Sequence, residues 1–458
     1  MATTNKRNRI SPMGNFFIFP AVLVLLFWFA CEKKSKPSAP NIILILCDTL
    51  RADHLSCCGY YRKTSPFIDS LIERGLFFEA CYAAASRTGP SISSLFTSLY
   101  PGFHGAVNSL EGEDMKAILG EGNRTMAEIL RDNGFYTYAI FSNVNASPLF
   151  GYAQGFEKYT FTNNPTARHV RLEAVKVLKK LTKKKPFFLY IHFMDPHSPY
   201  TPPEPFNNYF DPQYQGNVTG GSHKQLDRIM MQKEKVSSRD IEHLAAQYDG
   251  EIRYFDNELR ILFNNIESFG MLKDSIIIFT ADHGEEFFEH GKLLHGYTLY
   301  QEQLWVPLII MGKNIPIRKI SQPVSLIDLL PTLLNLSGIK EKTQFQGRNI
   351  LIKQKSMNFY LLYAEASLNA VFTIKYKSVI KNGWKYIYDV LDNSEELYNL
   401  GEDPEEKINL VSKNPPQLAQ LRKQMKKFIR ATAKSSGQTI TPIDEKTREQ
   451  LKTLGYIK

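Results

Sequence analysis

The chain alternates short, continuously apolar runs with segments whose apolar residues recur every three or four positions. The apolar runs, which are typical of strands buried on both faces of a sheet, lie at 41–47, 136–141, 186–194 and 275–280. The segments with helical spacing are 66–74, a helix from Pro90 onward, 126–133, 167–181 and 241–267. Strands that alternate with helices predict an α/β fold with a mainly parallel central sheet and helices on both faces.

The pattern changes near residue 340. Residues 360–379 and 384–390 resemble short strands of a meander, and 416–429 has the spacing of an amphipathic helix. We therefore expect a main domain at 41–340 and a smaller C-terminal α+β subdomain at 341–458. Within the main domain, a polar stretch with several glycines at 203–236 predicts a long surface insertion near the functional site.

The N-terminus has the organisation of an export signal. Basic residues precede an apolar run of 15 residues, Phe16–Ala30, which is short for a membrane span and has the length of a signal-peptide core. The run ends at Cys31, which resembles a bacterial lipoprotein signal, and an uncleaved signal anchor is the alternative. Either interpretation makes 1–31 a signal peptide or membrane anchor and 32–40 a tether. We expect an extracytoplasmic protein attached to a membrane through its N-terminus.

Composition limits the class of protein and of partner. The chain has 458 residues of which 43% are hydrophobic, enough for a large core, so global disorder is excluded. Its net charge of +10 favours anionic partners such as a phosphate or sulfate ester or an anionic lipid surface. Because the chain has neither zinc-finger spacing nor an aromatic-basic RNA motif, we expect no nucleic acid partner.

Acidic residues stand where two predicted strands end. Asp48 follows the strand at 41–47, and Asp282 with His283 follows the strand at 275–280. Sites in open α/β sheets are built at the carboxyl ends of strands. Oxygen and nitrogen donors that converge there suit a divalent metal, although Asp48 alone could also be a helix cap.

Further candidate ligands come from a histidine-rich segment and a later loop. These are His192, Asp195 and His197 after the strand at 186–194, and His295. Isolated histidines such as His104 and His290 fit a hydrogen-bonded structural role equally well.

From residue 40 onward the chain resembles the sulfatases, which belong to the alkaline phosphatase superfamily. The motifs that carry the resemblance follow one another in the family's order: 41–60, Thr64-Ser-Pro-Phe-Ile-Asp-Ser-Leu71, 91–104, Asp195-Pro-His-Ser-Pro-Tyr200, Asp282-His-Gly-Glu285, Asp328-Leu-Leu-Pro-Thr332, Glu396-Leu-Tyr-Asn-Leu400 and Leu454-Gly-Tyr-Ile457. The resemblance implies an alkaline-phosphatase-like fold. It also implies metal-dependent hydrolysis of an anionic ester of a sugar, lipid or nucleotide derivative.

The chain departs from the family at the nucleophile. Sulfatases begin the signature C-x-P-S-R with a Cys or Ser that is oxidised to formylglycine, and here Thr88 stands in that place while Ile92 replaces the Arg. Threonine cannot become the aldehyde. Thr49 replaces a second Asp of many sulfatases, and the family's GKWH segment reads Phe141-Ser-Asn-Val-Asn145. We therefore favour phosphoryl chemistry, in which a metal-activated Thr88 attacks phosphorus and a phospho-threonine is resolved by water or a second alcohol.

The resemblance also assigns roles to the other candidates. Asp48, Thr88, Asp282 and His283 would surround one divalent metal, which could be Zn, Mn or Ca. His295, with Asp195 or His197, would contact the substrate's oxygens or hold a second metal. His197 and His295 are therefore candidate catalytic residues beside Thr88. The residues expected to bind substrate oxygens are Asn108, Asn143 and His192.

Two alternatives remain open at this point. A phosphotransferase would move a lipid head-group, but transferases of that type usually carry several membrane spans, and this chain has at most one. An inactive sulfatase-like binding protein would keep Thr88 only as a helix N-cap.

Overall fold

The structure is a computed structural model in which residues 1–4, 8, 39–107, 115–181, 186–352, 361–367, 374–435, 437 and 439–453 are described. The chain divides into two compact units, Met1–Ser38 and Ala39–Lys458. The apolar run of the predicted signal segment, Phe16–Ala30, and Cys31 lie outside the described residues. In the part of the chain that is described, no helix has both the length and the apolar character needed to cross a membrane.

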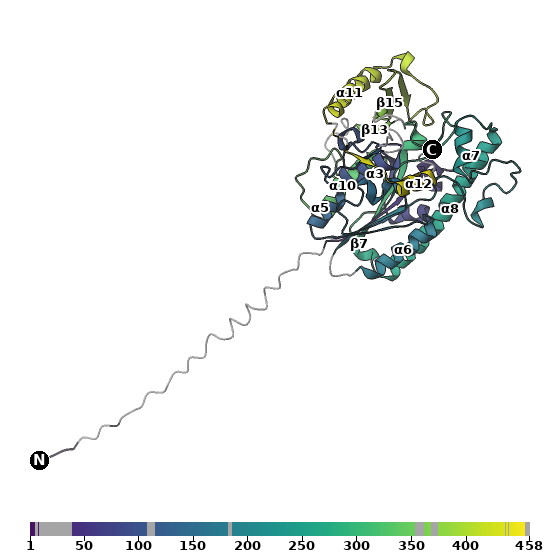
Figure 1. The fold of residues 1–458 in the computed structure, drawn as a ribbon. Coiled ribbons are helices and arrows are strands. Elements are labelled where there is room, and N and C mark those ends of the chain that lie inside the picture. Colours follow the sequence, from purple (N-terminus) through teal and green to yellow (C-terminus); the bar gives the residue numbers. More distant parts are fainter. Residues whose placement is uncertain are drawn as a thin grey trace. The chain divides into compact units, whose positions relative to one another are not determined.

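A large twisted sheet runs through the second unit (Figure 1). Its strands within the described residues are β1 (Asn41–Cys47), β2 (Gly75–Tyr82), β4 (Tyr136–Phe141), β5 (Lys158–Phe161), β6 (Phe187–Phe193), β7 (Ser275–Ala281), β10 (Trp305–Gly312), β11 (Arg318–Ile320) and β12 (Val324–Ser325). Their order is β11-β2-β10-β7-β1-β6-β4-β5, and β12 also pairs with β2. The pairs from β7 to β5 are parallel, whereas β10 pairs antiparallel with β2 and β7. The predicted mainly parallel sheet is confirmed.

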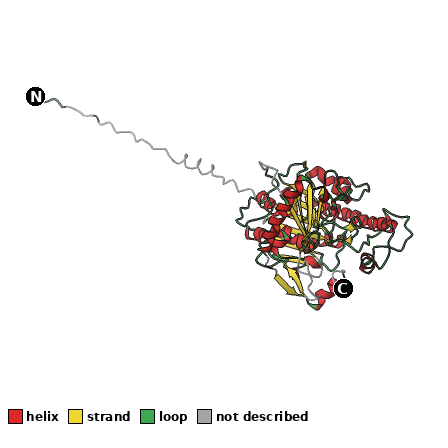
Figure 2. Ribbon diagram, turned by 90° about the horizontal axis from the view of Figure 1, so that it is seen from above, coloured by secondary structure: helices red, strands yellow, loops and turns green. Residues whose placement is uncertain are grey.

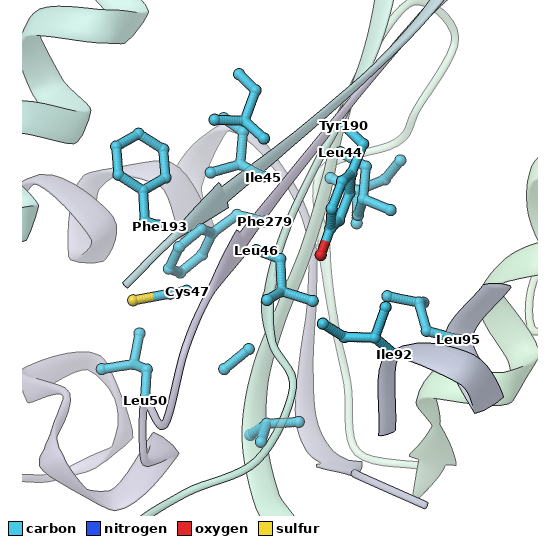
Figure 3. Packing of buried hydrophobic residues seen from close by; sticks show 14 of the residues in the cluster. Leu44, Ile45, Leu46, Cys47, Leu50, Ile92, Leu95, Tyr190, Phe193 and Phe279 are labelled. Carbon is cyan, nitrogen blue, oxygen red and sulfur yellow. The ribbon is translucent and has the colours of Figure 1, made fainter. Parts of the chain in front are cut away.

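Helices pack on both faces of the sheet (Figure 2). On one face, Phe255 of α8 (Ser238–Ser268) lies with its ring centroid 5.1 Å from that of Phe193 in β6. On the other face, Phe96 of α3 (Thr88–Thr97) lies 5.0 Å from Tyr190. Tyr190 and Phe193 are three positions apart on β6 and so point to opposite faces, as the close view shows (Figure 3). The central strands are therefore apolar along their whole length because both faces are covered.

The remaining described helices of the main domain include α2 (Pro66–Leu71), α4 (Pro101–His104), α5 (Met126–Asp132), α6 (Ala167–Lys180), α7 (His223–Met230), α9 (Gln301–Leu304) and α10 (Leu329–Leu336). Three of these helices, α2, α5 and α6, match the predicted segments 66–74, 126–133 and 167–181, whereas α4, α7, α9 and α10 were not predicted. The insertion at 203–236 contains α7, which the sequence did not predict. Its eight residues are mostly polar, and Leu226 and Ile229 are its only buried side chains.

A second, antiparallel sheet forms the C-terminal subdomain. It consists of β13 (Leu362–Ser367), β14 (Ile374–Lys381), β15 (Trp384–Asp389) and β16 (Glu395–Asn399). The helix α11 (Pro416–Ala433) packs on this sheet, and β17 (Thr439–Pro442) returns to pair with β3 (Met115–Ile118) of the main domain. The helix α12 (Glu445–Thr453) follows β17. The predicted meander and amphipathic helix are present, and the boundary near residue 340 stays a prediction.

Candidate active site

The register of the sheet brings two carboxylates together. Cys47 at the end of β1 pairs with Ala281 at the end of β7, so Asp48 and Asp282 leave neighbouring strands side by side. Thr49, which follows Asp48, has a positive φ of 55°. This backbone conformation costs energy for a residue with a branched side chain. The turn directs the Thr49 N–H toward Asp282 Oδ1 at 3.1 Å.

Asp48, Asp282 and His283 form a buried group whose potential ligand atoms lie within 4.8 Å of one another. We call these three residues the metal group. His283 Nε2 lies 3.8 Å from Asp48 Oδ1 and 3.3 Å from Asp282 Oδ2. The opposite ring nitrogen, His283 Nδ1, donates to the carbonyl of Gly284 at 2.9 Å, which leaves Nε2 with a lone pair. A lone pair that faces two buried carboxylates requires a positive charge between them.

Asp282 gives the clearest sign that this group is built for a cation. Its Oδ1 accepts hydrogen bonds from the backbone of Thr49 and His283, whereas its buried Oδ2 has no hydrogen-bond donor among the described residues. Burial and then the charge of Asp48 raise the pKa of Asp282 to about 7. Two carboxylates and an imidazole are a normal donor set for a divalent transition metal, so the residues fit such an ion.

Thr88 lies at the edge of this group. It is the first residue of α3, which begins two residues earlier than the predicted start at Pro90 because Arg87 has the extended backbone of an N-cap. Thr88 Oγ1 lies 3.3 Å from His283 Nε2 and 3.5 Å from Asp48 Oδ1, and the residue is 2% exposed. The N-terminus of α3 carries partial positive charge. The hydroxyl is therefore held where an anion would be stabilised.

His192 and Asn143 surround Asp48. Asp48 Oδ2 accepts from His192 Nε2 at 3.0 Å and from Asn143 Nδ2 at 2.5 Å, and all three residues are fully buried. Burial alone would raise the pKa of Asp48, but the hydrogen bond from His192 and the nearby histidines hold it well below its ordinary value. The sequence assigned His192 and Asn143 to substrate oxygens. In the structure both side chains donate to Asp48 and hold it in position, and their contact with substrate oxygens stays a prediction.

His197 and His295 lie next to one another beside the metal group. Their ring centroids are 4.9 Å apart, and the centroid of His295 is 4.6 Å from that of His283. His295 Nδ1 donates to Glu285 Oε1 at 2.9 Å, and His197 Nδ1 donates to the carbonyl of Ser198 at 2.6 Å. Burial lowers the pKa of His197 to about 4 and holds that of His295 well below its ordinary value. Both rings are therefore neutral near pH 7, with Nε2 as an acceptor.

Two predicted site residues are not found in this group. Asp195 is not among the residues whose ligand atoms cluster with Asp282 and His283. Its carboxyl group turns away toward Glu251 of α8, with which it interacts directly. Asn108 lies outside the described residues, and its predicted role stays a prediction.

Sequence reasoning missed Glu285 and His223. Glu285, in the Asp282-His-Gly-Glu285 motif, is fully buried and orients His295. His223 begins α7 in the insertion, which packs against β9 (Leu293–Leu294), next to His295. Burial, and then the proximity of His197, lowers the pKa of His223 to about 4. The position of Glu285 in its motif could have indicated this role, whereas no sequence signal links His223 to the site.

A second group of potential ligands comprises Glu286, His290 and Glu302. His290 Nδ1 donates to Glu302 Oε1 at 2.5 Å, and His290 Nε2 donates to the carbonyl of Glu406 at 3.1 Å. Both ring nitrogens of His290 are thus engaged as donors. This arrangement is an internal ion pair, as expected for a structural histidine.

Comparisons with known proteins identify the family of the chain. The sulfatase family model matches residues 40–339, and the model of the C-terminal region of N-sulphoglucosamine sulphohydrolase matches residues 289–435. A sulfatase of Formosa agariphila is 24% identical over 81% of this chain and 82% of its own length. The delta 4,5-hexuronate-2-O-sulfatase of Bacteroides thetaiotaomicron is 24% identical over 81% of this chain and 84% of its own length.

Solved structures share the fold at lower identity. A 2-O GAG sulfatase aligns with a TM-score of 0.71 and 19% identity over 90% of this chain and 96% of that one. The phosphonate monoester hydrolase of Agrobacterium radiobacter aligns with a TM-score of 0.68 and 17% identity over 87% of this chain and 96% of that one. The family model covers more than half of the sequence and includes the strands that carry Asp48, Asp282 and His283. The chain therefore belongs to the sulfatase family of ester hydrolases.

Proposed function

We propose that this protein is a metal-dependent hydrolase of phosphate esters in which Thr88 is the nucleophile. The observation that supports the proposal is the place of the Thr88 hydroxyl, 3.3 Å from His283 Nε2 and 3.5 Å from Asp48 Oδ1 at the start of α3. A Cys or Ser at this position would give formylglycine, whose hydrate releases sulfate by collapsing to the aldehyde. Thr88 carries a methyl group on Cβ and cannot follow that route.

The reaction divides into two displacements at phosphorus. In the first, Thr88 Oγ1 forms a bond to phosphorus, its proton passes to a histidine Nε2, and the bond from phosphorus to the alcohol oxygen breaks as that oxygen takes up a proton. In the second, water attacks phosphorus and gives up a proton, the bond from phosphorus to Thr88 Oγ1 breaks, and the Thr88 hydroxyl regains a proton as phosphate leaves. The backbone N–H groups at the start of α3 would bind the developing negative charge. His197 and His295, neutral near pH 7, can accept a proton through Nε2.

Asp48, Asp282, His283 and the Thr88 hydroxyl would hold the metal. A divalent cation there lowers the pKa of the bound hydroxyl and offsets the charge of the phosphoryl oxygens. A nitrogen ligand beside carboxylates suits Zn or Mn, whereas Ca takes oxygen ligands almost exclusively. Among Zn, Mn and Ca we therefore favour Zn or Mn.

The test is an assay of the purified full chain against aryl phosphate, bis-aryl phosphate and aryl sulfate, each with Zn, Mn or Ca added. We expect the highest kcat/KM on a phosphate ester. Thr88→Ala should lower it by about 10³-fold or more, since loss of a nucleophile leaves only the electrostatic contribution. Mass spectrometry of quenched enzyme should find a phosphate on the peptide that contains Thr88.

Thr88→Ser is the matched variant, with mass spectrometry to check that its serine is not oxidised to formylglycine; it keeps a hydroxyl in the same place and should retain measurable phosphatase activity. Activity that survives Thr88→Ala would exclude the proposed nucleophile. A higher kcat/KM on aryl sulfate would instead place this chain with relatives that are named sulfatases and overturn the choice of phosphorus.

We also propose that the chain is exported and held at a membrane through its N-terminus. The basic start, the apolar run Phe16–Ala30 and the following Cys31 support this proposal. Metabolic labelling with palmitate should mark the wild-type protein but not Cys31→Ser. Labelling that persists in the variant would exclude a lipid on Cys31.

A further inference from the structure

A cavity of about 650 Å³ opens beside the candidate active site. His197 lines it and at the same time lies 4.9 Å, centroid to centroid, from His295 of the active site. The cavity and the active site therefore share a wall. None of the roles assigned so far to residues of the active site involves this cavity.

Two buried acids, Asp195 and Glu251, line the cavity. Glu251, on α8, is 5% exposed and accepts from the Thr201 N–H at 2.7 Å through Oε1. Asp195 follows β6 and accepts from the Ala167 N–H at the start of α6. One oxygen of each acid, Asp195 Oδ2 and Glu251 Oε2, is buried without an N–H or O–H donor among the described residues.

The two acids face one another. Their side chains interact as a carboxyl–carboxylate pair, and such a pair shares one proton because two like charges at this distance cannot both ionise. Burial raises the pKa of both acids, that of Asp195 to about 6; the charge of Asp195 adds to the rise for Glu251, whereas the contact with Glu251 opposes it for Asp195. The pair therefore carries about one negative charge in the absence of a counter-ion.

No cation of the protein neutralises this pair within the described lining of the cavity. Arg171 is engaged with Glu258, the third acid of the lining. Arg168 and His169, also in the lining, are exposed side chains. The buried part of the cavity thus has an uncompensated negative charge, which favours a cationic ligand.

The size and walls of the cavity favour an organic cation over a metal ion. Asp195 and Glu251 are absent from the groups of at least three potential metal ligands in the described part of the chain. The volume of about 650 Å³ is that of a small-molecule site. Its walls include the aromatic rings of Phe206 and Tyr254, whose centroids are 5.8 Å apart, and aromatic faces attract organic cations.

We propose that this cavity binds a protonated amine, with Asp195 and Glu251 as its counter-ions, and that the amine belongs to the alcohol portion of the ester. The second part rests on the proposed function of Thr88. On binding, the ammonium group donates hydrogen bonds to Asp195 Oδ2 and Glu251 Oε2, the two buried oxygens that have no other donor among the described residues.

The binding test uses the full chain with Thr88→Ala, so that turnover plays no part. Isothermal titration calorimetry compares 2-aminoethanol with ethylene glycol, its neutral analogue. We expect 2-aminoethanol to bind at least 10-fold more tightly than ethylene glycol. Glu251→Gln, or Asp195→Asn if that variant does not fold, should weaken amine binding at least 10-fold. Glu204→Gln, at an exposed acid of the same lining, should change it less than twofold.

A kinetic comparison separates this proposal from the proposed function. For the chain with Thr88 intact, an aryl 2-aminoethyl phosphate should have a KM at least 10-fold below that of the aryl ethyl phosphate, and Glu251→Gln should remove the difference. Amine binding together with hydrolysis that ignores Thr88→Ala would refute the nucleophile and leave the cavity proposal standing. Equal affinity for amine and glycol, or Ca²⁺ binding without amine binding, would overturn the cavity proposal.

Discussion

Asp48 receives two hydrogen bonds on one oxygen, and this has consequences for the metal group. His192 and Asn143 fix Oδ2 and leave Oδ1 facing His283 and Thr88. Residues that hold a ligating carboxylate in this way raise metal affinity by orienting the ligand before the ion arrives. The position of Asp48 thus depends on two side chains that are not members of the metal group.

Asn143→Leu tests this dependence, because leucine has a similar volume and donates no hydrogen bond. We expect the affinity for Zn to fall about 10- to 100-fold, measured by titration against a competing chelator. The matched control is Asn164→Leu at an exposed asparagine, which should bind Zn like the wild type. Unchanged affinity in Asn143→Leu would show that Asp48 needs no such support.

His104 gives a pH dependence of stability that is independent of the metal group. Burial lowers the pKa of His104 to about 3, whereas an unfolded histidine titrates near 6.5. Between these values the unfolded chain binds more protons, so stability rises with pH in this window and falls as pH drops below about 6.5. The contribution is at most about 1.4 kcal/mol per pH unit.

Urea unfolding of the wild type and of His104→Asn at pH 5, 6, 7 and 8 measures this contribution. The free energy of unfolding of the wild type should fall more steeply from pH 7 to pH 5 than that of the variant. Parallel curves would mean that the buried imidazole titrates normally. His104 Nε2 lies 3.0 Å from Ser94 Oγ, and Nδ1 accepts from the Ala106 N–H at 3.1 Å, contacts that keep the ring neutral.

Among the elements, the loop after β7 carries most of the site and is packed closely against α9. A Cβ on Gly284 would lie 2.0 Å from the carbonyl oxygen of Glu302. The Gly284 N–H also donates to the carbonyl of Gln303 at 2.9 Å. The backbone of this loop therefore has no room to carry a larger residue beside His283.

Gly284→Ala should displace the loop and with it His283. We expect kcat/KM to fall at least 10-fold and the free energy of unfolding to fall by roughly 1–3 kcal/mol, as in overpacked interiors. Gly122→Ala is the control, because a Cβ there meets nothing within 4 Å. Steady-state kinetics and urea unfolding of both variants measure these two quantities. If Gly284→Ala had the kcat/KM and the free energy of unfolding of the wild type, the close packing of this loop would have no effect on the site.

The elements also show what could be predicted from the sequence. The apolar runs at 41–47 and 275–280 correctly predicted that Asp48, Asp282 and His283 follow two strands, since an apolar run bounded by polar residues marks where a strand ends. For Asp195 the end of a strand was not sufficient information. It places the residue at the edge of the sheet but does not determine whether the side chain turns toward the metal group or, as here, toward Glu251 on α8. The short helix α7 was missed because few of its residues are buried.

At the scale of the whole molecule, buried polar contacts join the C-terminal sheet to the main domain. Lys385 of β15 donates to Glu406 Oε2 at 3.0 Å, and both side chains are buried. The same oxygen accepts from the Gln301 N–H at the start of α9 at 2.6 Å. The carbonyl of Glu406 accepts from His290 in the loop that follows Asp282-His-Gly-Glu285. The subdomain is thus linked to the loop that carries the metal group.

Removing one partner of this ion pair should therefore affect both parts of the molecule. Lys385→Met leaves Glu406 buried without its counter-charge, which typically costs about 3–5 kcal/mol. We expect the midpoint of urea unfolding to fall accordingly. Because His290 and α9 contact Glu406, kcat/KM should fall as well. Lys423→Met, at an exposed lysine of α11, should change neither quantity.

The double variant Lys385→Met/Glu406→Leu distinguishes the charge from the packing. It removes both charges, so it should be more stable than Lys385→Met alone, although the Gln301 N–H loses its acceptor. If the double variant is less stable than the single one, the hydrogen bond to α9 rather than the ion pair holds the subdomain in place. In either case the activity of the two variants measures how far the metal group depends on a sheet that contributes no ligand to it.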